Sequence, residues 1–194
     1  MTLQLKPVEL DNAGRLYTNE EFEELPAFYE RYQLIEGKLV ERMSTGGEHG
    51  RVAGQIARRI TLFDPEEKIG LVWRDTGFNI ASGFIPTPDL AFVTLARMPV
   101  IDKKALKVVP DLVVEVHSPS DLKSKPGRDA AANKIRKYQA AGVKIVWAVN
   151  PDKQLVEAYH PGEVEPWKIY SLDDELDGED VLPGFKLKVA TLFK

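Results

Sequence analysis

Two apolar runs separated by a helical segment constrain the fold of this chain more than any other feature. The runs are Leu112–Val116 and Ile145–Val149, and an almost continuously apolar run is typical of a strand buried on both faces of a sheet. The segment between them, from about Arg128 to Ala141, has apolar residues at helical spacing and is followed by Gly142, a residue favoured just after a helix. A buried strand, a crossover helix and a second buried strand predict a βαβ unit with a parallel strand pair.

Shorter segments on both sides of this unit predict further elements. Before it, we expect helices at residues 19–30 and 49–63, a hairpin around 36–37, a loop at 44–47, and strands at 71–73, 78–80 and 89–93. After the first buried strand we expect a loop at 118–121, and after the second a hairpin of 155–159 with 167–170, an acidic loop at 173–180 and an edge strand over 185–189. The hairpins make the sheet mixed, so the predicted fold class is α/β, with a central mixed β-sheet flanked by helices.

Composition limits the chemistry that the chain can perform. Its 194 residues carry a net charge of −4, with 43% hydrophobic and 29% charged residues, which is an ordinary globular balance. The chain has no cysteine, and its three histidines are not at zinc-binding spacing, so thiol catalysis, disulfides and common zinc sites are excluded. Any metal chemistry would use oxygen ligands and a hard cation such as Mg²⁺. No apolar run of about 18 residues is present and the N-terminus does not resemble a signal peptide, so we expect a cytoplasmic protein without a membrane span.

Two acidic residues stand where acids are unexpected. Glu115 interrupts the apolar run Leu112–Val116, and a buried carboxylate without a partner is costly. It is either half of a salt bridge, or at a strand edge, or a metal ligand. Asp89 follows a Pro-Thr-Pro bend; alone it indicates a turn. If the two strands are neighbours, however, Asp89 and Glu115 meet, and with a main-chain carbonyl they make an oxygen-rich Mg²⁺ site.

Three basic or titratable residues are further candidates. Lys134 lies at the edge of the apolar stripe of its helix, where it either covers the core edge with its stem or reaches inward toward Glu115. His49 begins a helix in register with the apolar stripe, and is either a packed or capping residue or a neighbour of the site. His117 points to the same face of its strand as Glu115, and is either a site residue or a residue that merely ends the strand.

Taken together, these residues resemble the Uma-two family of PD-(D/E)XK endonucleases. The matching pieces are Leu34-Ile35-x-Gly37, Met43-Ser44, His49, Pro88-Asp89, Glu115-x-x-Ser118-Pro119-Ser120, Lys134-x-x-x-Tyr138-x-x-x-Gly142-Val143 and Trp147-x-Val149-x-Pro151. They span about residues 20–160 in the family's order.

The resemblance implies a restriction-endonuclease-like core, phosphodiester hydrolysis that depends on Mg²⁺, with Mn²⁺ as a possible substitute, and a homodimer acting on nucleic acid, most simply DNA. It assigns Asp89 and Glu115 as metal ligands, adds the carbonyl of Val116, and makes Lys134 the catalytic lysine. The general nuclease pattern has that lysine at position 117, where this chain has His117. The family's usual glutamate in the first hairpin is Gln33 here, which cannot supply a charge; Glu36 or Glu41 could take its place, although neither is aligned to that role.

The implied organisation is a single nuclease-like domain over residues 1–194. Residues 1–48 form an N-terminal helix and hairpin, 49–150 the core, and 151–194 the C-terminal strands. The extra N-terminal helix and hairpin and the C-terminal hairpin are additions to the core.

Charge distribution bears on nucleic-acid binding. The net charge opposes tight non-specific binding, yet residues 123–144 hold seven basic side chains and one acid, whereas 173–180 hold six acids. We therefore take Lys123, Lys125, Arg128 and Lys137 as candidates for binding phosphate, the alternative being a solvated helix face.

Two other functions stay open from the sequence. One is a nucleic-acid-binding or regulatory domain that kept the fold and lost turnover. The other is an unrelated hydrolase with two carboxylates, such as a glycosidase, which would require a sugar site with aromatic platforms and gives no reason for a lysine.

Overall fold

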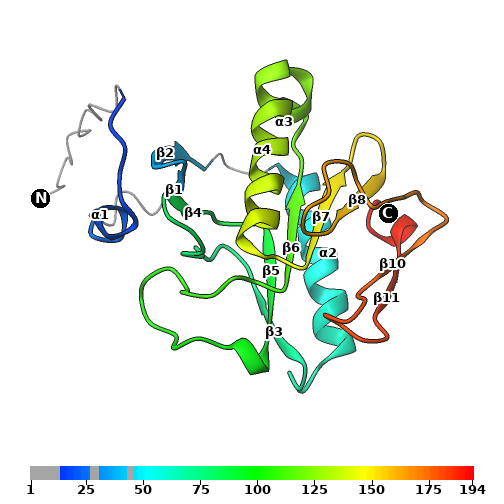
Figure 1. Cartoon of the computed structure of the whole chain (residues 1–194). Coiled ribbons are helices and arrows are strands. Elements are labelled where there is room, and N and C mark those ends of the chain that lie inside the picture. The colour runs from blue at the N-terminus through cyan, green and yellow to red at the C-terminus, as the bar shows by residue number, and fades with distance from the viewer. Residues whose placement is uncertain (1–13, 27–30, 43–45) are drawn as a thin grey trace, which may run out of the picture.

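The computed structural model describes residues 14–26, 31–42 and 46–194, and Figure 1 shows its arrangement. The centre is a six-stranded mixed sheet in the order β3-β5-β6-β7-β8-β9. Its strands are β3 (Gly70–Trp73), β5 (Leu90–Thr94), β6 (Leu112–Val116), β7 (Ile145–Asn150), β8 (Leu155–Tyr159) and β9 (Lys168–Tyr170). The β6–β7 pair is parallel and the other neighbouring pairs are antiparallel, so the predicted mixed sheet is confirmed.

The predicted βαβ unit forms at the middle of this sheet. β6 and β7 pair with Val114 opposite Trp147, and the connection between them contains α3 (Pro119–Lys123) and α4 (Lys125–Ala141). The side chain of Ser124 caps α4 by accepting a hydrogen bond from the backbone N–H of Gly127. The helix ends at Gly142, which has a φ of 95°, a conformation that glycine adopts without steric cost.

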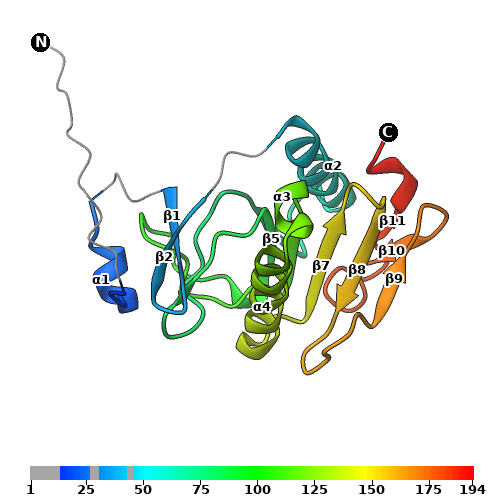
Figure 2. The ribbon, with the colours of Figure 1, turned by 90° about the horizontal axis from the view of Figure 1, so that it is seen from above.

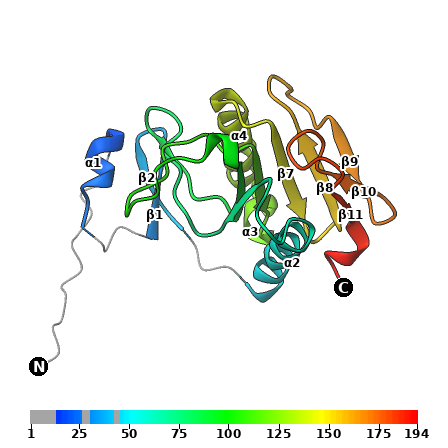
Figure 3. The ribbon, with the colours of Figure 1, turned by 90° about the horizontal axis from the view of Figure 1, so that it is seen from below.

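Helices cover both faces of the sheet, as Figures 2 and 3 show. On one face, α2 (Gly47–Phe63) packs through Val52, Ile56 and Ile60 in one core cluster. On the other face, Ile135 and Tyr138 of α4 belong to a second cluster. Because both faces are covered, β6 and β7 are apolar at almost every position.

The polar side chain of Asp64 sets the end of α2. Its carboxylate accepts hydrogen bonds of 2.7–3.3 Å from the backbone N–H groups of Lys68, Ile69 and Gly70. These bonds turn the chain directly into β3. The predicted end of this helix at residue 63 is therefore confirmed.

Two small sheets lie at opposite ends of the molecule (Figure 1). One has the order β2-β1-β4 and the other pairs β10 with β11. Their strands are β1 (Tyr32–Ile35), β2 (Lys38–Glu41), β4 (Phe84–Ile85), β10 (Glu175–Asp177) and β11 (Lys186–Lys188), and the remaining elements are α1 (Asn19–Glu23) and the 3₁₀ helices η2 (Leu95–Arg97) and η3 (Val189–Thr191). β1 and β2 form the hairpin predicted around Glu36-Gly37.

The loop predicted at 118–121 is wrong, because α3 begins at Pro119. Asp121 accepts hydrogen bonds from the backbone N–H and the hydroxyl of Ser118, and the two residues form a capping box. Proline is favourable at the first helical position. The N–H groups of the first turn have no partner within the helix, so the N–H that proline lacks is not missed there.

The strand predicted at 78–80 is also wrong. Phe78 makes only an isolated bridge to Leu106, and the Asn79 side chain donates to Glu23 of α1 at 2.8 Å. The segment therefore joins α1 to the body of the molecule instead of extending the sheet.

The C-terminal segment differs from the prediction in its partner. β11 does not extend an edge of the central sheet but pairs with β10, which forms inside the predicted acidic loop. Leu176 and Leu187 face each other in this pair and both are buried in the core cluster under α2. Burial of these leucines explains why the acidic segment folds into a strand.

At the N-terminal end, α1 stops at Glu23, short of the predicted length. The last part of that predicted helix, 27–30, and residues 44–45 of the predicted loop lie outside the described residues. Gly47 of that loop belongs to α2. No helix within the described parts of the chain is long and apolar enough to cross a membrane.

Candidate active site

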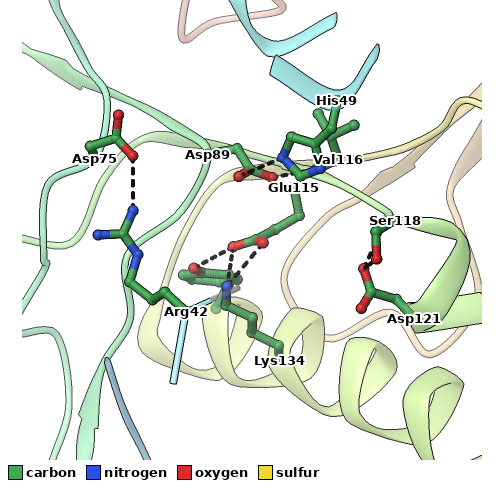
Figure 4. A network of polar contacts seen from close by, with 10 residues as sticks. Arg42, His49, Asp75, Asp89, Glu115, Val116, Ser118, Asp121 and Lys134 are labelled. Carbon is green, nitrogen blue, oxygen red and sulfur yellow. Dashed lines mark hydrogen bonds and ion pairs between the residues drawn. The ribbon is translucent and has the colours of Figure 1, made fainter. Parts of the chain in front are cut away.

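The register between β5 and β6 brings the two anomalous acids together. Leu90 pairs with Val114 in this antiparallel pair. Asp89 directly precedes Leu90 and Glu115 directly follows Val114, so the same register places Asp89 opposite Glu115. Residues opposite one another in an antiparallel pair have their side chains on the same face. Figure 4 shows the two carboxylates as neighbours.

Asp89 is held by one backbone group and one histidine. Its Oδ2 accepts a 2.7 Å hydrogen bond from the N–H of Val116, and its Oδ1 lies 2.8 Å from Nε2 of His49 in the first turn of α2. Burial alone would raise the pKa of Asp89, but His49 and the Val116 N–H outweigh it and hold the pKa below its usual value. Burial likewise opposes protonation of His49, and Asp89 outweighs it, so the pKa of His49 is raised.

Glu115 is held by two side chains from α4. Nζ of Lys134 lies 2.8 Å from Oε1 and 2.9 Å from Oε2, and the hydroxyl of Tyr138 donates a 2.7 Å hydrogen bond to Oε1. Burial raises the pKa of Glu115; Lys134 lowers it and the charge of Asp89 raises it further, with a net increase. The interrupted apolar run is thus explained by a carboxylate whose partners come from the crossover helix.

A cavity of about 510 Å³ opens onto these groups. The candidate residues that line it are His49, Asp89, Glu115, Val116, His117 and Lys134, together with Gln33 and Glu41 of the hairpin. His117 is partly buried, and that burial lowers its pKa. The side chain of Gln33 accepts a 3.3 Å hydrogen bond from the N–H of Thr87, so it supports the wall of the cavity.

Comparison with known proteins identifies the family. The family model described as "Uma2: Putative restriction endonuclease" matches residues 19–190. The chain belongs to the Uma2 family. Its fold is also similar to that of a crystal structure described as a putative nuclease from Anabaena variabilis, with a TM-score of 0.73 at 21% identity over 91% of this chain and 97% of the other. A search of curated proteins gave no match. The family resemblance and the restriction-endonuclease-like fold inferred from the sequence are therefore confirmed.

The structure places the candidate phosphate-binding residues outside the cavity that Asp89 and Glu115 line. None of Lys123, Lys125, Arg128 and Lys137 is among the residues that line it. Lys125 pairs with Asp129 at 2.7 Å, and Arg128 donates to the carbonyls of Leu122 and Lys123 at the end of α3.

Lys137 pairs instead with a residue of the first hairpin. Its Nζ lies 3.2 Å from Oε1 of Glu36, and Glu36 also accepts a hydrogen bond from Asn133. Glu41 pairs with Arg31 at 3.5 Å. Glu36 therefore joins the hairpin to α4, and it does not contact Asp89 or Glu115 in the structure.

Sequence reasoning missed three contributions to the site. Tyr138 was expected as part of the apolar stripe of its helix and of the family pattern but was given no role in the site, although it lies four residues after Lys134 and so on the same face. Arg42 and Asp75 also line the cavity and form an ion pair of 2.8 Å, and no sequence signal connects two residues so far apart in the chain.

The donor set of the cavity fits a hard divalent cation. Asp89 and Glu115 supply carboxylate oxygens that can accept further bonds, and Mg²⁺ is commonly bound by one or two carboxylates with water filling the other positions. Within the described residues, no group of three or more His, Cys, Asp or Glu is arranged to hold a metal. A cation here would therefore keep much of its coordination for water and substrate.

Proposed function

We propose that this Uma2 protein is a metal-dependent endonuclease that hydrolyses phosphodiester bonds in nucleic acid, with DNA as the first substrate to test. The family description supports a nuclease. The observation that carries the proposal is the meeting of Asp89 and Glu115, from adjacent strands, with Lys134 in one cavity.

In this proposal Asp89, Glu115 and the carbonyl of Val116 hold Mg²⁺, for which Mn²⁺ could substitute. When bound, the ion supplies Lewis-acid polarisation and a more acidic water. Lys134 orients the attacking water and offsets the negative charge that develops on the phosphate. His49 and Tyr138 hold the two carboxylates in place, through the contacts of 2.8 Å and 2.7 Å described above.

Charge around α3 and α4 supports a polyanionic substrate. Lys123, Lys125 and Arg128 are exposed on the helices that form one side of the cavity. Because Lys125 pairs with Asp129 and Lys137 with Glu36, the surplus positive charge among the four candidates comes from Lys123 and Arg128. Phosphate attraction of this kind is long-ranged and does not require contact with the reacting atoms. The homodimer, the single-domain organisation and the cytoplasmic location stay predictions.

A binding domain without turnover is the second candidate. It is favoured by the fact that all four carboxylate oxygens of Asp89 and Glu115 have protein partners. A glycosidase is not favoured, because none of the described residues that line the cavity is Trp, Tyr or Phe, the side chains that commonly form sugar platforms.

The test is cleavage of single- and double-stranded DNA and RNA by wild type and Asp89→Asn, in Mg²⁺, in Mn²⁺ and in EDTA. We expect cleavage only with wild type and metal. Equal cleavage by Asp89→Asn, or cleavage in EDTA, would contradict the proposed site. Binding without cleavage under every metal condition would favour the second candidate.

A further inference from the structure

A second cavity, of about 600 Å³, adjoins the active-site cavity. Successive side chains of a strand point to opposite faces, and β1 follows this rule, since Tyr32 lines the second cavity and Gln33 lines the first. Along β1, the second cavity therefore lies on the face of Tyr32 and the active-site cavity on the face of Gln33. They share three lining residues, Arg42, Asp75 and Thr87, and so meet where β2 ends.

The ion pair between Arg42 and Asp75 stands at this junction. Nη2 of Arg42 lies 2.8 Å from Oδ1 of Asp75, and the side chain of Arg42 is 29% exposed whereas that of Asp75 is 79% exposed. Figure 4 shows the pair beside the carboxylates of the site. Asp75 also has a φ of 50°, a left-handed conformation that Asp and Asn tolerate better than most residues. An ion pair with one highly exposed partner contributes little to stability, so a better anion can displace that partner.

Arg42 has the donors that a phosphate requires. A guanidinium presents five N–H donors in a planar fork, and within the described residues the side chain of Arg42 donates to Asp75 alone. Two exposed lysines, Lys103 and Lys104, line the far part of the second cavity. Two acids lie near them. Asp102 accepts a 2.7 Å hydrogen bond from the backbone N–H of Lys104, and Glu23, whose side chain is almost buried, lies 3.8 Å from Nζ of Lys104 and accepts a hydrogen bond from Asn79.

We propose that Arg42 binds a backbone phosphate of the nucleic acid at the point where the strand leaves the active-site cavity and enters the second cavity. Asp75 holds the guanidinium in place until the phosphate replaces the carboxylate. Lys103 attracts the next phosphates along the second cavity. This inference rests on the proposed function, because it assigns a path to the same substrate.

The test is binding of fluorescent single strands of about 4 and about 16 nucleotides, lengths that bracket known single-strand sites, measured by anisotropy in EDTA. Arg42→Ala should weaken binding about tenfold, the scale of a lost hydrogen bond to a charged group. It should also make the salt dependence shallower by about 0.7 in log–log slope. Asp75→Asn should tighten binding several-fold, because the competing charge is removed while the left-handed turn is kept.

The control is Lys188→Ala, which removes one positive charge from β11 at the opposite end of the molecule (Figure 1). It should change affinity no more than the altered net charge requires. Lys103→Ala should weaken binding of the long strand more than that of the short one. If Arg42 and Asp75 merely joined the hairpin to the rest of the fold, both variants would shift affinity in the same direction.

The outcome of this test is separable from that of the proposed function. If wild type cleaves with Mg²⁺ but Arg42→Ala binds as Lys188→Ala does, the inference is overturned and the nuclease stands. If wild type cleaves nothing while Arg42→Ala and Asp75→Asn shift affinity in opposite directions, the nuclease fails and the phosphate path stands. Absence of any binding by wild type overturns the path.

Discussion

The hydroxyl of Tyr138 donates a 2.7 Å hydrogen bond to Oε1 of Glu115, the oxygen that also lies 2.8 Å from Nζ of Lys134. Tyr138 is fully buried, and its ring packs edge to face on Phe84 with centroids 5.4 Å apart. One helix therefore supplies both a neutral donor and a cation to the same carboxylate, and a rigid aromatic contact fixes the donor.

Tyr138→Phe should lower activity while the other residues of the site stay in place. The ring contact is kept and only the hydrogen bond is lost, so the free energy of unfolding should fall by about 1.5–3 kcal/mol. Because Glu115 then loses one of its two restraints, we expect kcat to fall about tenfold with KM unchanged. Denaturant unfolding and steady-state cleavage measure the two effects.

Tyr159→Phe is the matched control for this prediction. The hydroxyl of Tyr159 donates a 2.9 Å hydrogen bond to Glu157, and neither residue lines the active-site cavity. The same chemical change should leave kcat as in wild type. Equal losses of kcat in the two variants would show that Tyr138 acts through general stability and not through Glu115.

Lys134→Ala and Asp89→Ala should both lose activity, but only one of them should also lose metal binding. Asp89 is a proposed metal ligand, so Asp89→Ala should lose metal binding and activity together. Lys134 is proposed to act on water and phosphate charge, so Lys134→Ala should still bind metal while the cleavage rate falls by about 10²–10³. Calorimetry with Mg²⁺ or Mn²⁺ and single-turnover cleavage on the same preparations separate the two.

The comparison for Lys134→Ala is Lys137→Ala, which changes a lysine three residues further along α4. Lys137 pairs with Glu36 and does not line the cavity. Its loss should weaken nucleic-acid binding modestly and in a salt-dependent way. Full activity of Lys134→Ala together with inactivity of Lys137→Ala would refute the role given to Lys134.

Divalent metal should stabilise the folded protein through Asp89 and Glu115. A ligand present at about 100 times its Kd adds about 2.7 kcal/mol to the free energy of unfolding, which for a domain of this size raises Tm by about 5–10 °C. Thermal unfolding in millimolar Mg²⁺ or Mn²⁺ measures the shift. Asp89→Ala should abolish it, and Asp129→Ala, which removes an exposed carboxylate paired with Lys125, should retain it.

Acid should weaken the fold through Asp111, a fully buried carboxylate outside the cavity. Burial alone would raise its pKa, but the N–H and hydroxyl of Thr94 together with Lys144 and Arg97 outweigh burial and lower it. A lowered pKa means that the folded state favours the carboxylate. This stability is complete above the unfolded value of about 3.9 and is lost as pH falls from there to the folded pKa.

Asp111→Asn tests that window. At pH 7 the variant should be less stable than wild type by about 1–3 kcal/mol, since Arg97 and Lys144 lose their charged partner. Denaturant unfolding from pH 7 to pH 3 should show a constant difference down to about pH 4.5 and a shrinking difference below it. If the stability difference between wild type and Asp111→Asn grew as the pH fell, the pKa of Asp111 would be raised in the folded state and not lowered.

Local pattern was sufficient for most of the fold. The apolar runs of β6 and β7, the stripe Val52, Ile56 and Ile60, and the hairpin around Gly37 all express periodicities that depend on neighbouring residues. The capping box at Ser118 and Asp121 and the proline at the first helical position were also local signals of a helix start, so the loop predicted at 118–121 was an error that the sequence itself could have prevented.

Elements that depend on distant partners were not predictable in this way. The segment 78–80 has strand-like composition, yet its partners are Leu106 and the helix α1. The acidic segment that contains β10 folds because Leu176 meets Leu187 and both bury under α2. In both places the deciding contact is remote in sequence, so the local pattern carries no information about it.

The amino-acid sequence by itself determined that Glu115 is an acid inside a buried strand and that Asp89 begins another, because burial patterns are local. Only the tertiary structure decided that they meet, since a slip of one residue between β5 and β6 would turn every side chain of one strand to the other face. The same packing delivers His49 from α2 and Tyr138 from α4 to the two carboxylates. A charged group inside a sheet is tolerated only where such partners converge, and their convergence is a property of the packed molecule.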